Sequence, residues 1–286
     1  MSDGRDKLVG LPTVERYEKE LALAKTAARE AGAIIMRHYA RPDIEVSTKP
    51  DKSPVTAADL EANAAITKRL AAGFPDDAIL TEETPDDPAR LAKRRVWIVD
   101  PLDGTRDFVA RTGDFCVHIG LAEDSEAVLG VVYQPTVDAL AWAVRGGGAF
   151  EERGGETRAL EASTRSAPGQ IRIGVSRLNL DEGLGKCLAA AGMVDRAVRL
   201  GASVKHIALA RGDLDAVLNL SPSEQEWDTC APEVIMREAG CTVTNGDGAP
   251  FRYNQPDLFR PRGSAASNGH CHSLVLRVMA PCLPVP

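Results

Sequence analysis

Long apolar runs are missing from this sequence of 286 residues. A helix that crosses a bilayer needs about 20 consecutive apolar residues, and no stretch of the chain has that length. The first seven residues have mixed charge and no apolar core behind them, so they do not predict a secretory signal. We therefore expect no membrane partner and a cytoplasmic location.

Closely spaced cysteine pairs are also missing. The six cysteines are scattered along the chain, and no Cys-x-x-Cys motif occurs. Disulfide bonds are rare in cytosolic proteins, where thiols are kept reduced. We therefore expect six free, buried thiols.

A surplus of basic residues is the third absence. The chain has 34 Lys and Arg against 41 Asp and Glu, a formal net charge of -7. Proteins that bind nucleic acid non-specifically need excess Lys and Arg to neutralise the phosphate backbone. We expect no nucleic-acid partner. A small anionic substrate would fit only where cations cancel the local negative charge.

What is present indicates a soluble globular protein of about two domains, with an ordinary composition of 44% hydrophobic and 26% charged residues. Residues 1–160 predict an α+β domain in which an antiparallel meander follows two amphipathic helices. Its expected helices are 14–40 and 59–72, and its expected strands are 78–80, 96–99, 115–121, 127–133 and 139–144. The polar residues 41–58 predict a loop.

Residues 161–286 have a different pattern, in which short strands and helices alternate as in an α/β domain. The expected strands are 171–175, 197–200, 214–219 and 241–244, and the expected helices are 181–191, 203–211 and 229–239. The low hydrophobicity of residues 151–170 predicts the passage between the two domains.

The sharpest local signal is the run Asp100–Thr105, with the sequence DPLDGT, directly after an apolar strand. Pro101 fixes φ and removes a backbone donor, so the chain turns there. Gly104 permits an unusual dihedral angle or a close approach to a ligand. If a helix begins at this point, its free N–H groups form an anion site. A single Asp in a turn would be structural, but two acids with Pro, Gly and Thr favour a functional site.

Three other acidic positions join this run. Glu82-Glu83 follows a predicted strand, and Asp59 and Asp228 each stand at the start of a predicted helix. Taken singly, they suit a solvated loop and two N-caps. Taken together, they suit Mg²⁺, which prefers carboxylate oxygens and neutralises phosphate. Most of the net charge of -7 comes from five acids, since the chain without them would have a charge of -2: Asp59, Glu82, Asp100, Asp103 and Asp228. Two or three Mg²⁺ ions would roughly neutralise the negative charge of these five side chains.

In this order and spacing, the motifs resemble the lithium-sensitive, magnesium-dependent phosphatase superfamily that includes inositol monophosphatase. The pattern is an Asp, then Glu-Glu, then Asp-Pro-Ile/Leu-Asp-Gly-Thr, then Trp-Asp-x-x-Ala. Here Trp227–Ala231 supplies the last element, and Pro232 stands where a small residue usually follows. Because we place Pro232 in the first turn of a helix, we expect it to cost little. The resemblance implies a layered αβαβα sandwich with the site between an α+β half and an α/β half.

Shorter motifs make the chain look most similar to the bacterial 3'(2'),5'-bisphosphate nucleotidases within this superfamily. They are Arg106-Asp107-Phe108 after the Gly-Thr, Val175-Ser176-Arg177, Gly201–Lys205, which resembles Gly-Ser-Ser-x-Lys with Ala202 in place of a Ser, and Arg252–Gln255, which resembles a motif of actinobacterial members. The implied reaction removes the 3'-phosphate from 3'-phosphoadenosine 5'-phosphate (PAP) and gives AMP.

The resemblance also implies roles for individual residues. Glu82, Asp100 and the Leu102 carbonyl would hold one Mg²⁺. Asp100, Asp103 and Asp228 would hold a second, and a third would lie near Glu82 and Asp59. Asp59 and Thr105 would orient and deprotonate the attacking water. The amides of Gly104 and Thr105 would bind phosphate, and Ser176, Arg177 and Lys205 would bind the rest of the nucleotide, although Arg177 and Lys205 suit solvated surface charges equally well.

Three alternatives stay open. An inositol monophosphatase or a broad sugar phosphatase would carry the same metal motif. An aspartyl-phosphate phosphatase needs Asp-x-Asp-Gly-Thr, and the spacing here is one residue longer. A protein that binds nucleotide and metal without catalysis is the third. Members of this superfamily often form homodimers, which we regard as an expectation for this chain.

Overall fold

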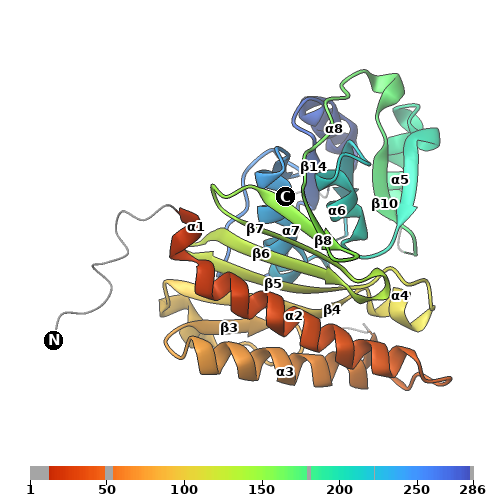
Figure 1. Cartoon of the computed structure of the whole chain (residues 1–286). Coiled ribbons are helices and arrows are strands. Elements are labelled where there is room, and N and C mark those ends of the chain that lie inside the picture. Colours follow the sequence, from red (N-terminus) through yellow and green to blue (C-terminus); the bar gives the residue numbers. More distant parts are fainter. Residues whose placement is uncertain (1–12, 49–53, 179–181, 222, 284–286) are drawn as a thin grey trace.

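The architecture is a stack of helical and sheet layers. The computed structural model describes residues 13–48, 54–178, 182–221 and 223–283. In these residues, a helical layer, a seven-stranded sheet, a second helical layer, a five-stranded sheet and a third helical layer follow one another (Figure 1). This confirms the predicted αβαβα sandwich. The N-terminal segment that does not predict a secretory signal lies outside the described residues.

The seven-stranded sheet has its strands in chain order, so each connection joins neighbours. Its strands are β3 (Ala78–Thr81), β4 (Arg95–Asp103), β5 (Cys116–Glu123), β6 (Glu126–Gln134), β7 (Ala139–Val144), β8 (Ala149–Arg153) and β9 (Glu156–Ala159). Strand β3 is parallel to β4, and all other pairs are antiparallel. The predicted meander is confirmed. The passage predicted at 151–170 is wrong in its first part, because β8 and β9 extend the sheet to Ala159.

The first helical layer covers one face of this sheet. It contains α1 (Thr13–Arg16), α2 (Glu18–Tyr39) and α3 (Ala57–Gly73). Four of the eight buried residues of α2 are alanines and one is a glycine, and these small side chains let the helix lie close to α3 and the sheet. The loop predicted at 41–58 contains a small hairpin of β1 (Val46–Thr48) and β2 (Pro54–Thr56).

The five-stranded sheet has the order β11-β10-β12-β14-β13. Its strands are β10 (Ile173–Ser176), β11 (Ala197–Leu200), β12 (Ala216–Asn219), β13 (Thr242–Asn245) and β14 (Ser264–Ser267). The first three strands in this order are parallel, and β14 is antiparallel to both of its neighbours. The outer helices are α5 (Glu182–Ala190) and α8 (His272–Met279). Within the described residues, the 3-10 turns are η2 (Pro88–Ala92), η3 (Pro135–Val137), η4 (Pro168–Gln170), η5 (Val194–Arg196) and η6 (Ala280–Cys282).

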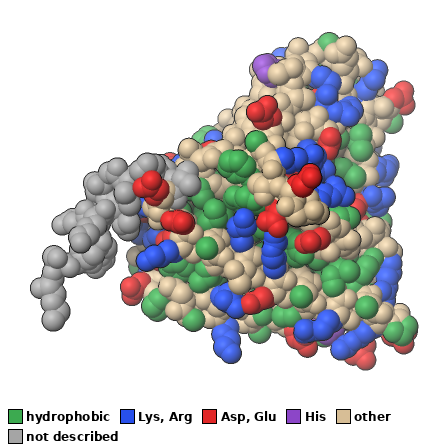
Figure 2. Space-filling view, viewed as in Figure 1, with side chains coloured by type: hydrophobic (Ala, Val, Ile, Leu, Met, Phe, Trp, Pro, Cys, Tyr) green, Lys and Arg blue, Asp and Glu red, His purple; other side chains and the backbone are tan. Residues whose placement is uncertain are grey.

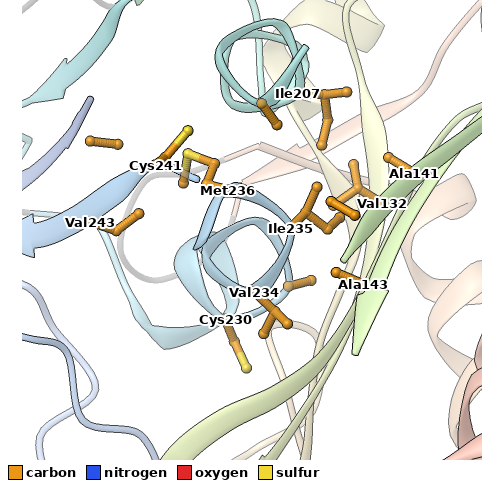
Figure 3. Packing of buried hydrophobic residues seen from close by; sticks show 14 of the residues in the cluster. Val132, Ala141, Ala143, Ile207, Cys230, Val234, Ile235, Met236, Cys241 and Val243 are labelled. Atoms are coloured by element: carbon orange, nitrogen blue, oxygen red, sulfur yellow. The ribbon is translucent and has the colours of Figure 1, made fainter. Parts of the chain in front are cut away.

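The central layer consists of α6 (Val204–Ala210) and α7 (Glu226–Glu238), and it joins the two sheets into one core. Figure 3 shows Ile235 of α7 facing Val132 and Ala141 of the seven-stranded sheet. The helix packs very close to that sheet at Gly130. A Cβ at this position would lie only 2.2 Å from the Ala231 carbonyl oxygen. Glycine is therefore required here for close packing.

Pro232 corrects one expectation. It is the seventh residue of α7, in the second turn, because the helix begins at Glu226 rather than at 229. A proline there removes the N–H that would bond to the carbonyl of Asp228, at a typical cost of about 3 kcal/mol in a helix interior. The cost is offset by burial, since Pro232 lies among the buried residues of the helix.

The cysteines also differ from the expectation. Cys187 of α5 and Cys282 of η6 form a disulfide bond across 95 residues, while Cys116, Cys230, Cys241 and Cys271 are free and buried. The bond ties the outer helix α5 to the segment after α8. Sequence spacing could not reveal it, because only the fold brings these two positions together.

Loss of this disulfide is expected to lower stability. Cross-linking residues so far apart restricts the unfolded chain, and removal of a native disulfide typically costs about 2–5 kcal/mol. Urea unfolding of the oxidised protein and of the Cys187→Ser/Cys282→Ser variant should show that difference in the free energy of unfolding. Reduced wild type should behave like the variant. Equal unfolding midpoints in all three samples would contradict the prediction.

The surface and the helices add two observations. No helix in the described part of the chain is long and apolar enough to cross a membrane. On the face viewed in Figure 2, acidic and basic side chains are intermixed. Of the five acids singled out in the sequence, Asp59 and Asp100 are buried, and Glu82, Asp103 and Asp228 are half-buried.

Candidate active site

A pocket of about 260 Å³ lies between the two halves of the chain. Glu82, Asp103, Gly104 and Thr105 contribute to its wall from the first half. Ser176, Ala202, Ser203, Lys205 and Asp228 contribute from the second half. Acidic side chains and two cationic side chains, Arg106 and Lys205, thus line one cavity.

Asp100 and Asp103 stand where β4 leaves its regular pairing with β5. The register shifts between these two residues, so their side chains do not alternate across the sheet as in a regular strand. The Leu102 amide donates to Asp100 Oδ1 at 3.0 Å, which holds the turn. Both carboxylates are thereby brought to the same end of the strand.

Three carboxylates meet there. Asp100, Asp103 and Asp228 each offer one oxygen, and these oxygens lie within 4.8 Å of one another. Burial and then repulsion from Glu82, Asp103 and Asp228 raise the pKa of Asp100 well above its usual value. Burial and then the charges of Asp103 and Glu82 do the same for the pKa of Asp228. Such a cluster of hard oxygen donors fits a divalent cation, which would relieve the repulsion.

Asp103 differs from its neighbours because a backbone amide and a histidine ring lie close to its carboxyl group. Its Oδ2 accepts from the Ser203 amide at 2.6 Å and lies 3.1 Å from His118 Nε2. Burial alone would raise the pKa of Asp103, but His118 and these contacts hold it well below the usual range. The Ser203 amide and His118 therefore fix the Asp103 carboxyl group beside the other two acids of the cluster.

Asp59 and Thr105 form a second polar group beside the carboxylates. Asp59 Oδ2 accepts from the Thr56 amide and hydroxyl at 2.8 and 2.6 Å, and Oδ1 accepts from the Thr105 hydroxyl at 3.0 Å. Burial raises the pKa of Asp59, and the Thr56 and Thr105 bonds lower it in part. A buried carboxylate bonded to a hydroxyl in the pocket wall has the arrangement of a proton acceptor.

Asp59 and Asp228 have the same place in their helices. Both are third residues, and each reaches back to the amide of the residue before its helix, Thr56 or Gln225. They are therefore not the N-caps that their sequence context suggested. Oδ2 of each satisfies a helix-end amide, which fixes the side chain while Oδ1 is left for other contacts.

Gly104 is required where it stands. It has a φ of +92°, and a Cβ would lie 2.8 Å from that of Ala202 and 3.0 Å from the Asp114 carbonyl oxygen. It precedes the short helix α4 (Thr105–Val109), so the amides of this turn open toward the pocket. A helix therefore does begin directly after the acidic run, which is the condition for an anion site there.

The residues expected around the rest of a substrate divide into two groups. Ser176 and Lys205 line the pocket, and Lys205 Nζ donates to the Ala202 carbonyl at 2.6 Å. Arg177 is not among the lining residues, and it pairs with Asp114 at 2.6 Å. The structure therefore does not bring Arg177 to the carboxylates.

His118 and Ser203 were not expected from the sequence. His118 is fully buried on β5, where every residue is buried. A polar residue inside such an apolar run is a signal that could have indicated a partner for a nearby acid. Ser203 acts through its backbone amide, so its side-chain type carries no such signal.

Comparison with known proteins agrees with this geometry. A family model described as "Inositol monophosphatase family" matches residues 16–280. The 3'(2'),5'-bisphosphate nucleotidase CysQ of Salmonella typhimurium is 35% identical over 237 residues, which cover 81% of this chain and 93% of the relative. A 3'-phosphoadenosine 5'-phosphate phosphatase of Mycobacterium leprae is 34% identical and covers 86% of this chain and 89% of the relative. A crystal structure of CysQ from Bacteroides thetaiotaomicron has a TM-score of 0.75 at 30% identity, with 87% and 96% of the two chains covered.

Proposed function

The chain belongs to the inositol monophosphatase family, and from this premise we propose that it is a phosphatase that removes the 3'-phosphate from PAP to give AMP and phosphate. The observation that carries the proposal is the similarity, over most of the chain, to relatives named as bisphosphate nucleotidases and as a PAP phosphatase. The pocket supports it, because Arg106 and Lys205 lie in the wall of the carboxylate site, where a second phosphate would need cations.

Divalent metal ions are part of the proposal. Glu82, Asp100, Asp103, Asp228 and the Leu102 carbonyl would hold two Mg²⁺ ions, and a third would lie near Glu82 and Asp59. When bound, the ions would neutralise the substrate phosphate and acidify an attacking water. The fit rests on the donor set, because carboxylate and carbonyl oxygens suit Mg²⁺. Burial, and then the charges of neighbouring acids, raise the pKa values of Asp100 and Asp228, and bound cations would offset both effects.

The chain's own groups would move the proton and position the phosphate. The Thr105 hydroxyl donates to Asp59, so its oxygen can accept a proton from water while Asp59 takes the hydroxyl proton. The amides of Gly104 and Thr105 would bind the transferred phosphate, and Ser176 and Lys205 would bind the rest of the nucleotide. Water then attacks in line, and no covalent phosphoenzyme forms.

Phosphate release from PAP and from inositol 1-phosphate tests the proposal. The two substrates are compared with Mg²⁺ and with a chelator. We expect a strong preference for PAP and loss of activity on chelation. A preference for inositol phosphate would keep the site and move the specificity to an inositol monophosphatase, the alternative that the family model suggests. Hydrolysis of neither substrate, or a trapped phosphoenzyme, would overturn the proposal. The dimer, the cytoplasmic location and the lack of a nucleic-acid partner stay predictions.

A further inference from the structure

One segment that does not line the pocket contacts two elements next to site residues. Residues 251–260, which we call the strap, are the middle part of the connection between β13 and β14. They include the Arg252–Gln255 motif. The strap touches the first half of the chain through the Tyr253 amide, which donates to the Ser125 carbonyl at 3.0 Å. It also touches the start of α7, the helix that carries Asp228.

The contact with α7 is made mainly by Glu226, the first residue of that helix. Glu226 is fully buried, and its two oxygens accept from the amides of Asn254 and Gln255 at 2.7 and 2.9 Å. It does not line the pocket, yet it lies two residues before Asp228. Two charge-assisted bonds to a rigid backbone therefore fix the helix end that presents Asp228.

The two residues before Glu226 are also bonded to the strap. The Arg260 amide donates to the Glu224 carbonyl at 2.8 Å, and Gln225 forms a β-bridge with Phe259. The three consecutive residues Glu224–Glu226 are thus all bonded to the strap. The Gln225 amide in turn donates to Asp228 Oδ2. A displacement of Gln225 would therefore also displace the Asp228 carboxylate.

The residues of the strap that bind Glu226, Asn254 and Gln255, are also bonded to the segment that follows Glu82. Arg90 of η2 is buried, and it donates to Asn254 Oδ1 at 2.8 Å and to the Gln255 carbonyl at 2.9 Å. Asn254 Nδ2 donates back to the Arg90 carbonyl at 3.1 Å. Asn254 has a φ of +57°, a conformation that Asn tolerates better than most residues. The strap therefore links the loop beyond Glu82 to the helix of Asp228.

We propose that Glu226 is a positioning residue that, through the strap, sets the place of Asp228 relative to the other carboxylates and so determines the affinity of the site for divalent cations. This rests on the metal site of the proposed function. Outer partners of metal ligands typically change metal affinity by about 10–100-fold when they are replaced. Glu226 acts one step further out, through backbone and helix end, so the lower part of that range applies.

The test measures Mn²⁺ binding to the full chain directly, by the electron paramagnetic resonance signal of free Mn²⁺. Glu226→Gln keeps the size of the side chain but turns an amide group toward a donor N–H. We expect its Kd for Mn²⁺ to rise about tenfold. Glu233→Gln is the matched control, because Glu233 is buried on the same helix and accepts from Tyr253 of the strap, but lies beyond Asp228 along the helix. It should lower the melting temperature and leave the Kd unchanged.

Each outcome decides between the alternatives. Wild-type affinity in Glu226→Gln, or an equal loss in Glu233→Gln, would overturn the positioning role, since the second result indicates general loosening. If Glu226→Gln does not fold, Arg90→Lys replaces it, because Lys lacks the planar guanidinium through which Arg90 holds Asp86, Asn254 and Gln255 together. Arg90→Lys should then weaken Mn²⁺ binding several-fold, and an unchanged Kd would overturn the proposal. A wild type that binds no Mn²⁺ would instead refute the metal site itself, and the inference with it.

Discussion

Replacing Asp100 by asparagine is expected to lower the rate of phosphate release by at least about a thousandfold. Bound cations supply several kcal/mol of charge stabilisation in phosphoryl transfer, and about 4 kcal/mol corresponds to a factor of a thousand. Asp100 is nearly inaccessible and is one of three acids whose oxygens converge within 4.8 Å. Asn retains an oxygen that can accept the Leu102 amide, so the loss would reflect the missing charge.

The same substitution is expected to stabilise the metal-free protein. Burial and the charges of Glu82, Asp103 and Asp228 raise the folded-state pKa of Asp100 above its value in the unfolded chain. Between those two pKa values the folded state binds more protons, so stability falls as pH rises through that window. Asp100→Asn removes this decline. Inactivation together with stabilisation is unusual, because most substitutions at buried positions destabilise.

Thermal unfolding in a chelator at several pH values, beside phosphate release, measures both effects. Asp124→Asn is the matched control, since it removes the same charge from an exposed position. It should change neither the rate nor the pH dependence. Near-normal turnover of Asp100→Asn at moderate Mg²⁺ would refute the metal-ligand role. A metal-free variant that is less stable than wild type at neutral pH would refute the electrostatic argument.

Much of the site could be predicted from sequence, because its motifs are local. The two acids of Asp100–Thr105 follow a buried strand directly, and the strand end and turn residues are visible in the sequence. Asp59 and Asp228 are likewise local features of helix starts. Their mutual distance in the fold is what the sequence alone does not contain, and the family resemblance supplied it.

The missed elements share a different cause. Strand β14 has the sequence Ser-Ala-Ala-Ser, without the branched and aromatic residues typical of strands. It is a strand because β12 and β13 pair with it on both sides. The disulfide Cys187–Cys282 and the Glu226 contacts with the strap also depend on long-range packing. By contrast, the hairpin of β8 and β9 has a local signal, Gly154-Gly155, that the low hydrophobicity concealed.

Asp59→Asn is expected to lower kcat by about 100- to 10,000-fold, the usual contribution of a general base. Asp59 is fully buried, and its Oδ1 accepts the Thr105 hydroxyl at 3.0 Å. An amide cannot take that proton, so the relay from water through Thr105 ends. Mn²⁺ binding by Asp100, Asp103 and Asp228 should persist, because Asp59 is not one of the three acids whose oxygens converge.

The pH dependence of kcat separates a proton acceptor from a merely structural carboxylate. Burial raises the pKa of Asp59, with Thr56 and Thr105 lowering it in part, and only the ionised form can act as base. The wild-type kcat should therefore rise with pH through that raised pKa and then level off, and Asp59→Asn should lose this limb. Thr105→Ser is the matched control, since it keeps the hydroxyl and should retain most of kcat, whereas Thr105→Val should not. Equal activity of the Ser and Val variants would show that the hydroxyl carries no proton, and the relay would have to be abandoned.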